Sequence, residues 1–307
     1  MFHLKKKKEN WRPYVFSLPY FLIYFAFNLF PVIYTFFISL TDWNGINERH
    51  FIGLSNYKEL LANDPNFWKA IGNTVIMYCG YFPLNMILGL ILAVCLHSAL
   101  TKGRRFLQVA YFLPYITTPV AIGLIFSLLF DKSVGLINRI LAVILPSFEA
   151  IDWLGTPVLV KLIVILIVFW RFGGYYTIFY MAGLSNISPD IYEAADIDGA
   201  NVFQKFFKIT IPQLKQTMIF LFITGTIGSL QMLEEPMLLV SGWSSQSVAV
   251  GGVDRSVLTA VWYLYDTSFS TTNNFGKGSA ISYLLFLIIA ILTLVFLKIS
   301  NRKEKTA

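Results

Sequence analysis

Six long apolar segments, separated by shorter polar stretches, dominate the hydrophobic pattern of the chain. They lie near residues 14–40, 71–97, 106–130, 157–183, 217–240 and 278–299. A helix rises about 1.5 Å per residue, so about 20 apolar residues can cross the hydrocarbon core of a bilayer. The polar stretches 41–70 and 131–156 contain turn formers such as Asn44-Gly45 and indicate short connections. The pattern predicts an all-α, polytopic membrane protein with six transmembrane helices.

The first apolar segment follows four lysines, Lys5 to Lys8, as the core of a secretory signal peptide would. Its apolar run exceeds the roughly 7–15 residues of such a core, and no cleavage site of small residues follows it. We therefore expect a retained membrane anchor.

Composition agrees with a membrane location. Hydrophobic residues make up 56% of the chain and charged residues 13%, and the mean hydropathy is +0.63. A soluble domain of this length could not bury so much apolar surface. The net charge of +7 is concentrated beside the apolar segments, which is typical of a topology signal and argues against nucleic-acid binding. Cys79 and Cys95 lie in one apolar segment about 24 Å apart along a helix, too far for a disulfide.

The distribution of lysine and arginine predicts the orientation, because these residues are enriched in cytoplasmic connections. One set of connections holds eight of them: Arg49, Lys58, Lys69, Lys132, Arg139, Lys161, Arg255 and Lys277. The other, shorter set holds fifteen: Lys5, Lys6, Lys7, Lys8, Arg12, Lys102, Arg104, Arg105, Lys205, Lys208, Lys215, Lys298, Arg302, Lys303 and Lys305. Both termini are therefore expected in the cytoplasm. The predicted organisation is a basic segment over 1–13, a transmembrane domain over 14–299 with a cytoplasmic loop at 185–216, and a tail over 300–307.

The loop between the fourth and fifth apolar segments predicts two short helices. Ser188 is a candidate N-cap with Pro189 at the first helical position, and Gly199 can take the positive φ that ends a helix. A second, amphipathic helix is expected from Val202 to Ile209, with Lys205 and Lys208 on the side opposite its phenylalanines, which are Phe203, Phe206 and Phe207.

The spacing in this loop resembles the signature of permease subunits of binding-protein-dependent ABC importers. Glu193-Ala194-Ala195, Gly199 and Ile209-x-Ile211-Pro212 match it, with Ile211 in place of the usual leucine. Several neighbouring segments are similar to the carbohydrate, maltose-type branch: Ala182-Gly183-Leu184, Asp198-Gly199-Ala200, Gly53-Leu54-Ser55-Asn56-Tyr57, Phe67-Trp68 and Asn73-Thr74. The resemblance extends from about Pro13 to Ile299.

The resemblance implies a permease in the cell membrane of a prokaryote that couples to separate ATP-binding subunits. The coupling residues would be Glu193, Ala194, Ala195, Asp198, Gly199 and Pro212. The implied partners are a second homologous permease, two ATP-binding subunits and an extracytoplasmic sugar-binding protein. No cofactor is expected in this chain, because ATP would be bound by the partner subunits. The alternative is an ordinary cytosolic hairpin, in which Glu193 only complements the helix dipole.

Motifs for catalysis and metal binding are missing from the sequence. The fragment Gly276-Lys277-Gly278-Ser279 breaks the phosphate-binding loop pattern, and His3, His50 and His97 lack metal-ligand spacing. The chain is therefore not expected to be an enzyme or to bind a metal.

Polar residues within the apolar segments are candidates for a translocation pathway, because polar groups in a bilayer are costly. The candidates are Arg171, Tyr175, Gln231, Glu234 and Glu235. Gln231 and Glu235 would be neighbours on one helical face, and Arg171 would lie near a kink at Gly173-Gly174. Arg171 could equally be structural, and the glutamates could face water or the binding protein. Gly225, Gly228 and Ser229 favour helix packing over a site.

The sequence thus predicts a permease half of a sugar or oligosaccharide importer. An importer of a non-sugar solute, such as glycerol phosphate or a polyamine, is the first alternative. A self-sufficient secondary transporter is the second, but it would require inverted repeats with matching broken spans, and none is evident. The identity of the sugar is left open.

Overall fold

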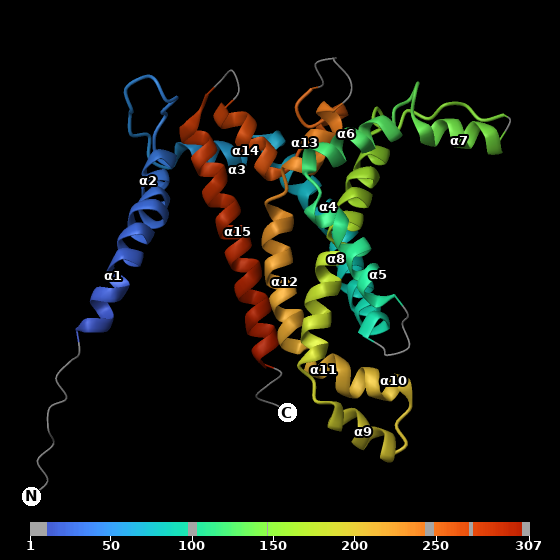
Figure 1. Cartoon of the computed structure of the whole chain (residues 1–307). Coiled ribbons are helices and arrows are strands. Elements are labelled where there is room, and N and C mark those ends of the chain that lie inside the picture. The colour runs from blue at the N-terminus through green and yellow to red at the C-terminus, as the bar shows by residue number, and fades with distance from the viewer. Residues whose placement is uncertain (1–10, 98–102, 146, 243–248, 270–272, 303–307) are drawn as a thin grey trace, which may run out of the picture.

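The computed structural model describes residues 11–97, 103–145, 147–242, 249–269 and 273–302. Within these ranges the regular secondary structure is helical, and short irregular segments join the helices; one isolated bridge links Thr41 and Phe51. The lysines at 5–8, 102, 303 and 305 lie outside the described residues, as do most of the predicted terminal segments. The helices shown in Figure 1 are α1 (Arg12–Tyr24), η1 (Phe25–Leu29), α2 (Phe30–Ser39), α3 (Ser55–Ala62), α4 (Pro65–His97), α5 (Arg104–Ile116), α6 (Pro119–Leu129), α7 (Leu136–Ile144), α8 (Pro157–Ser185), α9 (Pro189–Ile197), α10 (Val202–Lys205), η2 (Phe206–Thr210), α11 (Ile211–Gln213), α12 (Lys215–Leu230), α13 (Glu234–Ser241), η3 (Val253–Arg255), α14 (Ala260–Phe269) and α15 (Phe275–Arg302).

Among the described residues, five helical segments are long and apolar enough to cross a membrane, and there are six if a bent pair of helices is counted as one span. The five are Tyr14–Ser39, α4, α8, Lys215–Ser241 and α15. The pair is α5 and α6, which meet at 91°. The all-α class is confirmed, and the apolar segment predicted over 106–130 forms two helices with a bend between them. Thr118 precedes Pro119 and takes extended backbone angles, because the proline ring disfavours helical geometry at the residue before it.

The bundle is built around α4 and α8, which carry most of its buried side chains, including Met77, Val164, Ile167 and Tyr180. Glycines let these helices approach their neighbours closely. A Cβ on Gly174 would lie 2.0 Å from the Tyr111 carbonyl oxygen of α5. The helix α8 continues without a break through Gly173-Gly174, where a kink was considered, and the missing side chain of Gly174 serves packing against α5.

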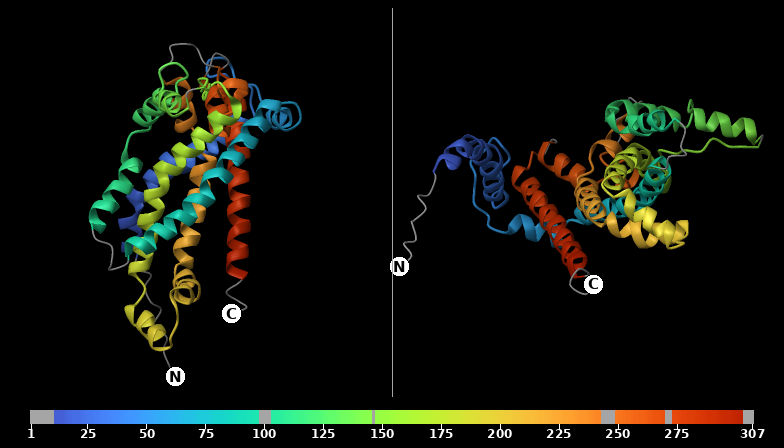
Figure 2. Two further views of the ribbon diagram at one scale, coloured as in Figure 1. Left: turned by 90° about the vertical axis from the view of Figure 1, so that its right-hand side faces the viewer. Right: turned by 60° about the horizontal axis from the view of Figure 1, so that its bottom comes forward.

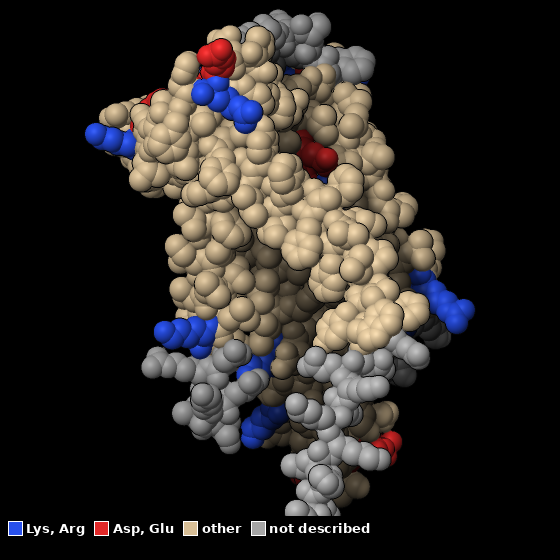
Figure 3. Space-filling model, turned by 90° about the vertical axis from the view of Figure 1, so that its left-hand side faces the viewer, with Lys and Arg blue, Asp and Glu red and all other residues tan. Residues whose placement is uncertain are grey.

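Different sets of short helices lie at the two ends of the bundle. The start of α1, the end of α15 and α9 to α11 lie at one end, called the lower end after Figure 1. The short helices α3, α6, α7, α13 and α14 lie at the upper end, and α14 was not expected from the sequence. Figure 3 shows charged side chains mainly near the two ends with an uncharged band between them. The connections between the spans therefore lie in two groups, one at each end, as the distribution of lysine and arginine predicts.

The upper end is tied together by a buried ion-pair cluster. Asp64 caps the start of α4 by accepting the N–H groups of Asn66 and Phe67 at 3.0 and 3.2 Å. Lys277, near the start of α15, contacts Asp64 and Glu59 at 2.8 Å each. Burial alone would raise the pKa of Asp64, but hydrogen bonds from Lys277, Tyr263 and the Phe67 N–H lower it below its ordinary value. Asp64 therefore stays charged at neutral pH, and the contacts among Asp64, Lys277, Tyr263 and Glu59 fix α3, α4, α14 and α15 to one another.

The first span stands apart from the other helices. Its most apolar stretch is only 6% buried, and Figure 2 shows it to one side of the molecule. It touches the bundle through α2, where Phe36 packs against Tyr283 at 5.2 Å between ring centroids and the Tyr283 hydroxyl donates to the Val32 carbonyl. Most of the surface of this span is available to lipid or to another chain.

Candidate translocation cavity and coupling surface

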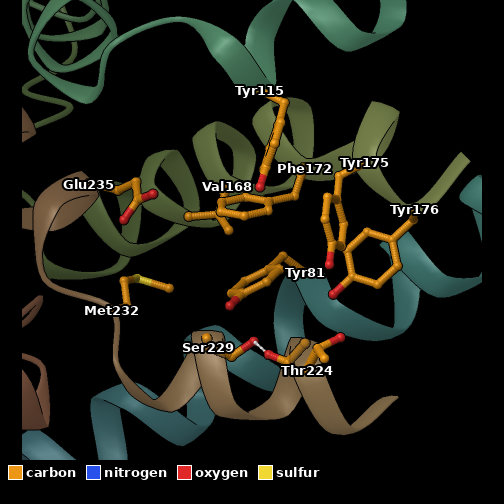
Figure 4. Close-up of a pocket in the computed structure, with 12 residues that line it drawn as sticks. Tyr81, Tyr115, Val168, Phe172, Tyr175, Tyr176, Thr224, Ser229, Met232 and Glu235 are labelled. Atoms are coloured by element: carbon orange, nitrogen blue, oxygen red, sulfur yellow. Dashed lines mark hydrogen bonds between the residues drawn. The ribbon is translucent and has the colours of Figure 1, made fainter. Parts of the chain in front are cut away.

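A cavity of about 160 Å³ lies between α4, α5, α8 and α12, towards the upper half of the bundle. Aromatic side chains form most of its wall (Figure 4): Tyr81, Tyr115, Phe172, Tyr175 and Tyr176. Tyr115 and Tyr175 are 5.1 Å apart between ring centroids. The rest of the lining comes from smaller or polar residues, which are Val168, Thr224, Gly225, Gly228, Ser229, Met232 and Glu235. The cavity thus combines aromatic faces with hydroxyl groups and one carboxylate, a lining suited to a polar, uncharged ligand.

The carboxylate of Glu235, in α13, is paired with the guanidinium of Arg171, in α8. The Glu235 Oε1 accepts a hydrogen bond from Nη1 of Arg171, and the two side chains are only 10% and 12% exposed. The guanidinium also lies 5.4 Å from the ring centroid of Phe172. The Nε of Arg171 is buried without a hydrogen-bond partner in the described part of the chain. The pair is neutral as a unit and holds α8 against α13.

The predicted face shared by Gln231 and Glu235 does not form. The helix ends at Leu230 and resumes at Glu234, so the spacing of four residues no longer places two side chains on one side. Gln231 is exposed and lines a different groove, between α2, α12 and α15. Glu234 is also exposed and is not part of the cavity wall. Of the five predicted pathway residues, Tyr175 and Glu235 line the cavity and Arg171 reaches it through its ion pair.

The small residues of α12 have two different roles. Gly225 packs tightly, since a Cβ there would lie 2.4 Å from the Tyr176 hydroxyl and 2.5 Å from the Phe82 ring. A Cβ on Gly228 would meet nothing within 4 Å, and this residue lines the cavity. The expectation of a packing face therefore holds for Gly225, whereas Gly228 keeps the cavity open.

Sequence reasoning missed three tyrosines of the wall. Tyr81, Tyr115 and Tyr176 come from three different helices. Tyrosines are frequent in this chain, which holds 16 of them, so no single one stands out by type or position. Among the three, only Tyr176 could have been suggested by the sequence, because it directly follows the predicted pathway residue Tyr175.

The coupling residues predicted in the loop lie on and beside α9 at the lower end. The Ser188 hydroxyl accepts the N–H of Asp190 at 3.3 Å, which confirms the expected N-cap. Glu193 and Ala194 are exposed, but Ala195 is buried against the bundle. Only one alanine of the pair is therefore available to a partner surface. Pro212 is exposed in α11, where the chain turns into α12.

The end of α9 has the geometry of a Schellman motif. Gly199 has φ +73°, and its N–H bonds the Asp196 carbonyl at 3.1 Å. The N–H of Ala200 bonds the Ala195 carbonyl at 2.9 Å, which is the second bond of the motif. Asp198 is the exposed C-cap residue. The predicted left-handed glycine is confirmed.

The helix after Gly199 differs from the expected amphipathic pattern. Five residues, Phe206–Thr210, form a π-helical turn that changes the side on which later side chains fall. Phe206 packs inward, whereas Phe203 and Phe207 are exposed. Lys205 is half-buried and forms an ion pair with Asp196 of α9. A groove of about 560 Å³ is thus left between α9, α10 and the end of α4, with Glu193 on its rim.

The helical hairpin is connected firmly to the spans. The Tyr192 hydroxyl lies 2.9 Å from the Thr210 hydroxyl, which joins α9 to the approach to α12. A Cβ on Gly183 would lie 2.7 Å from the Leu214 side chain, so the end of α8 and the start of α12 are in close contact. These contacts join the hairpin to the two spans that carry Arg171 and Gly228.

Residues 85–303 match the family model described as binding-protein-dependent transport system inner membrane component. The lactose transport system permease protein LacF of Rhizobium radiobacter is 34% identical over 292 residues, covering 95% of this chain and 94% of that protein. The arabinooligosaccharides transport system permease protein AraP of Bacillus subtilis is 34% identical, covering 96% and 93%. The trehalose/maltose transport system permease protein MalF of Thermococcus litoralis is 32% identical, covering 96% of each.

A solved structure has the same fold. It is a bacterial alginate ABC transporter in complex with an alginate pentasaccharide-bound periplasmic protein, and one of its chains superposes with a TM-score of 0.80. That chain is 21% identical, and the match covers 96% of both chains. The similarity supports the predicted all-α membrane fold.

Proposed function

Because the chain belongs to the family of binding-protein-dependent transport system inner membrane components, we propose that it is one membrane subunit of an ATP-driven importer of sugars or oligosaccharides. The observation that carries the coupling part is the exposed acidic and apolar surface of α9 and α10. Glu193 and Ala194 are exposed there beside Ile197 and Phe203. Such a patch on a rigid hairpin is suited to docking in a cleft of another protein.

The lining of the cavity supports a sugar as the substrate class. Aromatic faces stack on the apolar faces of sugar rings, and Glu235, Ser229 and Thr224 can bind hydroxyl groups. The relatives with known names include permeases for lactose, arabinooligosaccharides and trehalose/maltose. The cavity is less suited to a phosphate or polyamine substrate, because Arg171 and Glu235 are paired with each other and leave no free charge to bind one.

The size of the cavity implies that it widens during transport. Its volume of about 160 Å³ is below the roughly 300–1,000 Å³ of typical ligand pockets. At this volume it could hold only part of an oligosaccharide. ATP binding in partner subunits would supply the energy for opening, transmitted from α9 through α8 and α12.

A second, homologous permease is expected on the side of the first span. The groove of about 820 Å³ between α2, α12 and α15 is lined by apolar side chains together with Gln231. A partner span seated there would cover Gln231, which is otherwise an exposed amide at the level of the membrane. Two ATP-binding subunits at the lower end and a sugar-binding protein at the upper end complete the proposed assembly.

The proposed orientation places the lower end in the cytoplasm and can be measured with thiol labelling. In a variant with Cys79 and Cys95 replaced by serine, a cysteine at exposed Asn63 is expected to react with an impermeant maleimide in intact cells. A cysteine at exposed Lys208 should react only after the membrane is permeabilised. Labelling of the Lys208 position in intact cells would contradict the orientation.

The docking role of α9 is tested by Glu193→Ala. A charge-assisted hydrogen bond contributes about 1.5–3 kcal/mol, so binding to the ATP-binding subunits should weaken by roughly 10- to 150-fold. The measurement is the affinity of the purified permease pair for its ATP-binding subunits, together with ATP hydrolysis stimulated by the binding protein. Glu149→Ala removes an exposed carboxylate from the upper end and serves as the control. Equal affinities for the two variants would leave α9 as a passive connection.

A further inference from the structure

The short helix α7 extends sideways from the upper end of the bundle. It runs across the direction of the spans and lies on the side of the molecule opposite the first span (Figures 1 and 2). The chain enters it from α6 and returns from it to α8. Its position is therefore away from the groove proposed for the second permease.

One side of α7 is fixed to the rest of the chain through Asn138. The buried Asn138 amide donates to the carbonyls of Lys132 and Ile151 at 3.0 and 2.9 Å and accepts from the Trp153 indole at 2.8 Å. Trp153 in turn packs against Phe130 at the end of α6, with 5.6 Å between ring centroids. These contacts orient the helix and hold the returning segment 151–153 against one side of it.

The opposite side of α7 is apolar and uncovered. Successive residues of a helix are separated by about 100°, which places Leu136, Ile140, Val143 and Ile144 within about 60° of the direction opposite Asn138. All four side chains are exposed, Val143 by 84% and Ile144 by 66%. No side chain of the described residues buries this face. Arg139, which is exposed, lies on the flank between the two sides.

The apolar face continues the apolar surface of the neighbouring helix α6. Val120, Leu124, Ile125 and Leu128 of α6 are exposed as well. In Figure 1 the returning segment passes on the side of α7 that faces away from the spans, so the apolar face looks towards the level of the membrane. Four large apolar residues beside an exposed cation are the pattern of a helix that lies in a membrane interface.

We propose that α7 is an interfacial anchor that lies in the outer leaflet of the membrane. Its apolar face sits at the boundary between headgroups and acyl chains, and Arg139 contacts lipid phosphate. Through Asn138 and Trp153 the helix holds the upper ends of α6 and α8 at a fixed depth. This proposal concerns the lipid surface and does not depend on which solute is transported.

The test uses the assembled transporter in lipid nanodiscs, with Cys79 and Cys95 replaced by serine. A nitroxide label is attached to a single cysteine at Val143 in one sample and at Ala142, an exposed residue on the Asn138 side, in the other. Accessibility is measured to oxygen, which concentrates in lipid, and to a water-soluble nickel chelate. The label at Val143 is expected to be severalfold more accessible to oxygen than to the chelate. The label at Ala142 is expected to be more accessible to the chelate.

Two results would overturn the proposal. If the labels at Val143 and Ala142 were both more accessible to the chelate than to oxygen, the apolar face of α7 would lie in water. Protection of Val143 from both reagents would show that another protein chain covers it. A label at Ile140 provides an independent reading of the same face and should behave like Val143.

Discussion

Replacing either member of the Arg171–Glu235 pair with leucine is expected to abolish sugar uptake and to lower the yield of assembled transporter. Each replacement leaves an uncompensated charge in a site where the side chains are about 10% exposed. Removing one partner of a buried ion pair costs about 3–5 kcal/mol, which is a large part of the stability of a typical domain. Glu235→Gln retains the shape and a hydrogen-bond acceptor, so it should reduce uptake less than Glu235→Leu.

The double variant Arg171→Leu, Glu235→Leu separates stability from transport. With both charges gone no buried charge is unpaired, so assembly should recover. Uptake should not recover, because the cavity then lacks its carboxylate and a sugar hydroxyl would lose its partner at a cost of about 1–3 kcal/mol. Assembly is measured by recovery of the complex, and uptake with labelled sugar. Normal uptake by the double variant would place the pair outside the pathway.

Gly199→Val is expected to reduce transport more than any other single change in the loop. The residue has φ +73°, and a left-handed conformation costs a residue with a side chain about 1–2 kcal/mol, with β-branched residues the least tolerant. Loss of this conformation would break both bonds of the Schellman motif and turn α10 away from α9. The readout is ATP hydrolysis that no longer leads to uptake.

Gly199→Asn is the matched control for this position. A Cβ at Gly199 would meet nothing within 4 Å, so the effect of valine comes from the backbone and not from a clash. Asparagine adopts left-handed angles more readily than other residues with side chains, and it should retain most of the transport. If asparagine and valine were equally harmful, the backbone angle would not be the cause.

The part of the loop from Ser188 to Gly199 could be predicted in detail because its determinants are local. A capping serine, a proline at the first helical position and a glycine at the end of the helix act within a few residues of one another. The apolar segments were equally clear, since their length alone indicates membrane spans. The break at Thr118-Pro119 also had a local signal, which the hydrophobic pattern outweighed.

The cavity could not be predicted, because it depends on contacts between distant residues. Arg171 and Glu235 are 64 residues apart in the chain, and Tyr81, Tyr115 and Tyr176 meet only when three helices pack. The interruption after Leu230 has a local signal, Pro236 in the first turn of α13, which the helical-face prediction did not take into account. It rotates Gln231 and Glu235 to different sides of the span, so the prediction that they share one helical face was wrong.

The central claim is that this chain imports sugar only when a separate subunit hydrolyses ATP and pushes on α9. The most direct measurement reconstitutes the complex, purified through a tag on this chain, into liposomes with ATP inside and labelled lactose, arabino-oligosaccharides or trehalose outside. Uptake of at least one sugar is predicted to require ATP, the external binding protein and an intact Glu193. Uptake by this chain alone, or uptake driven by an ion gradient without ATP, would contradict the account.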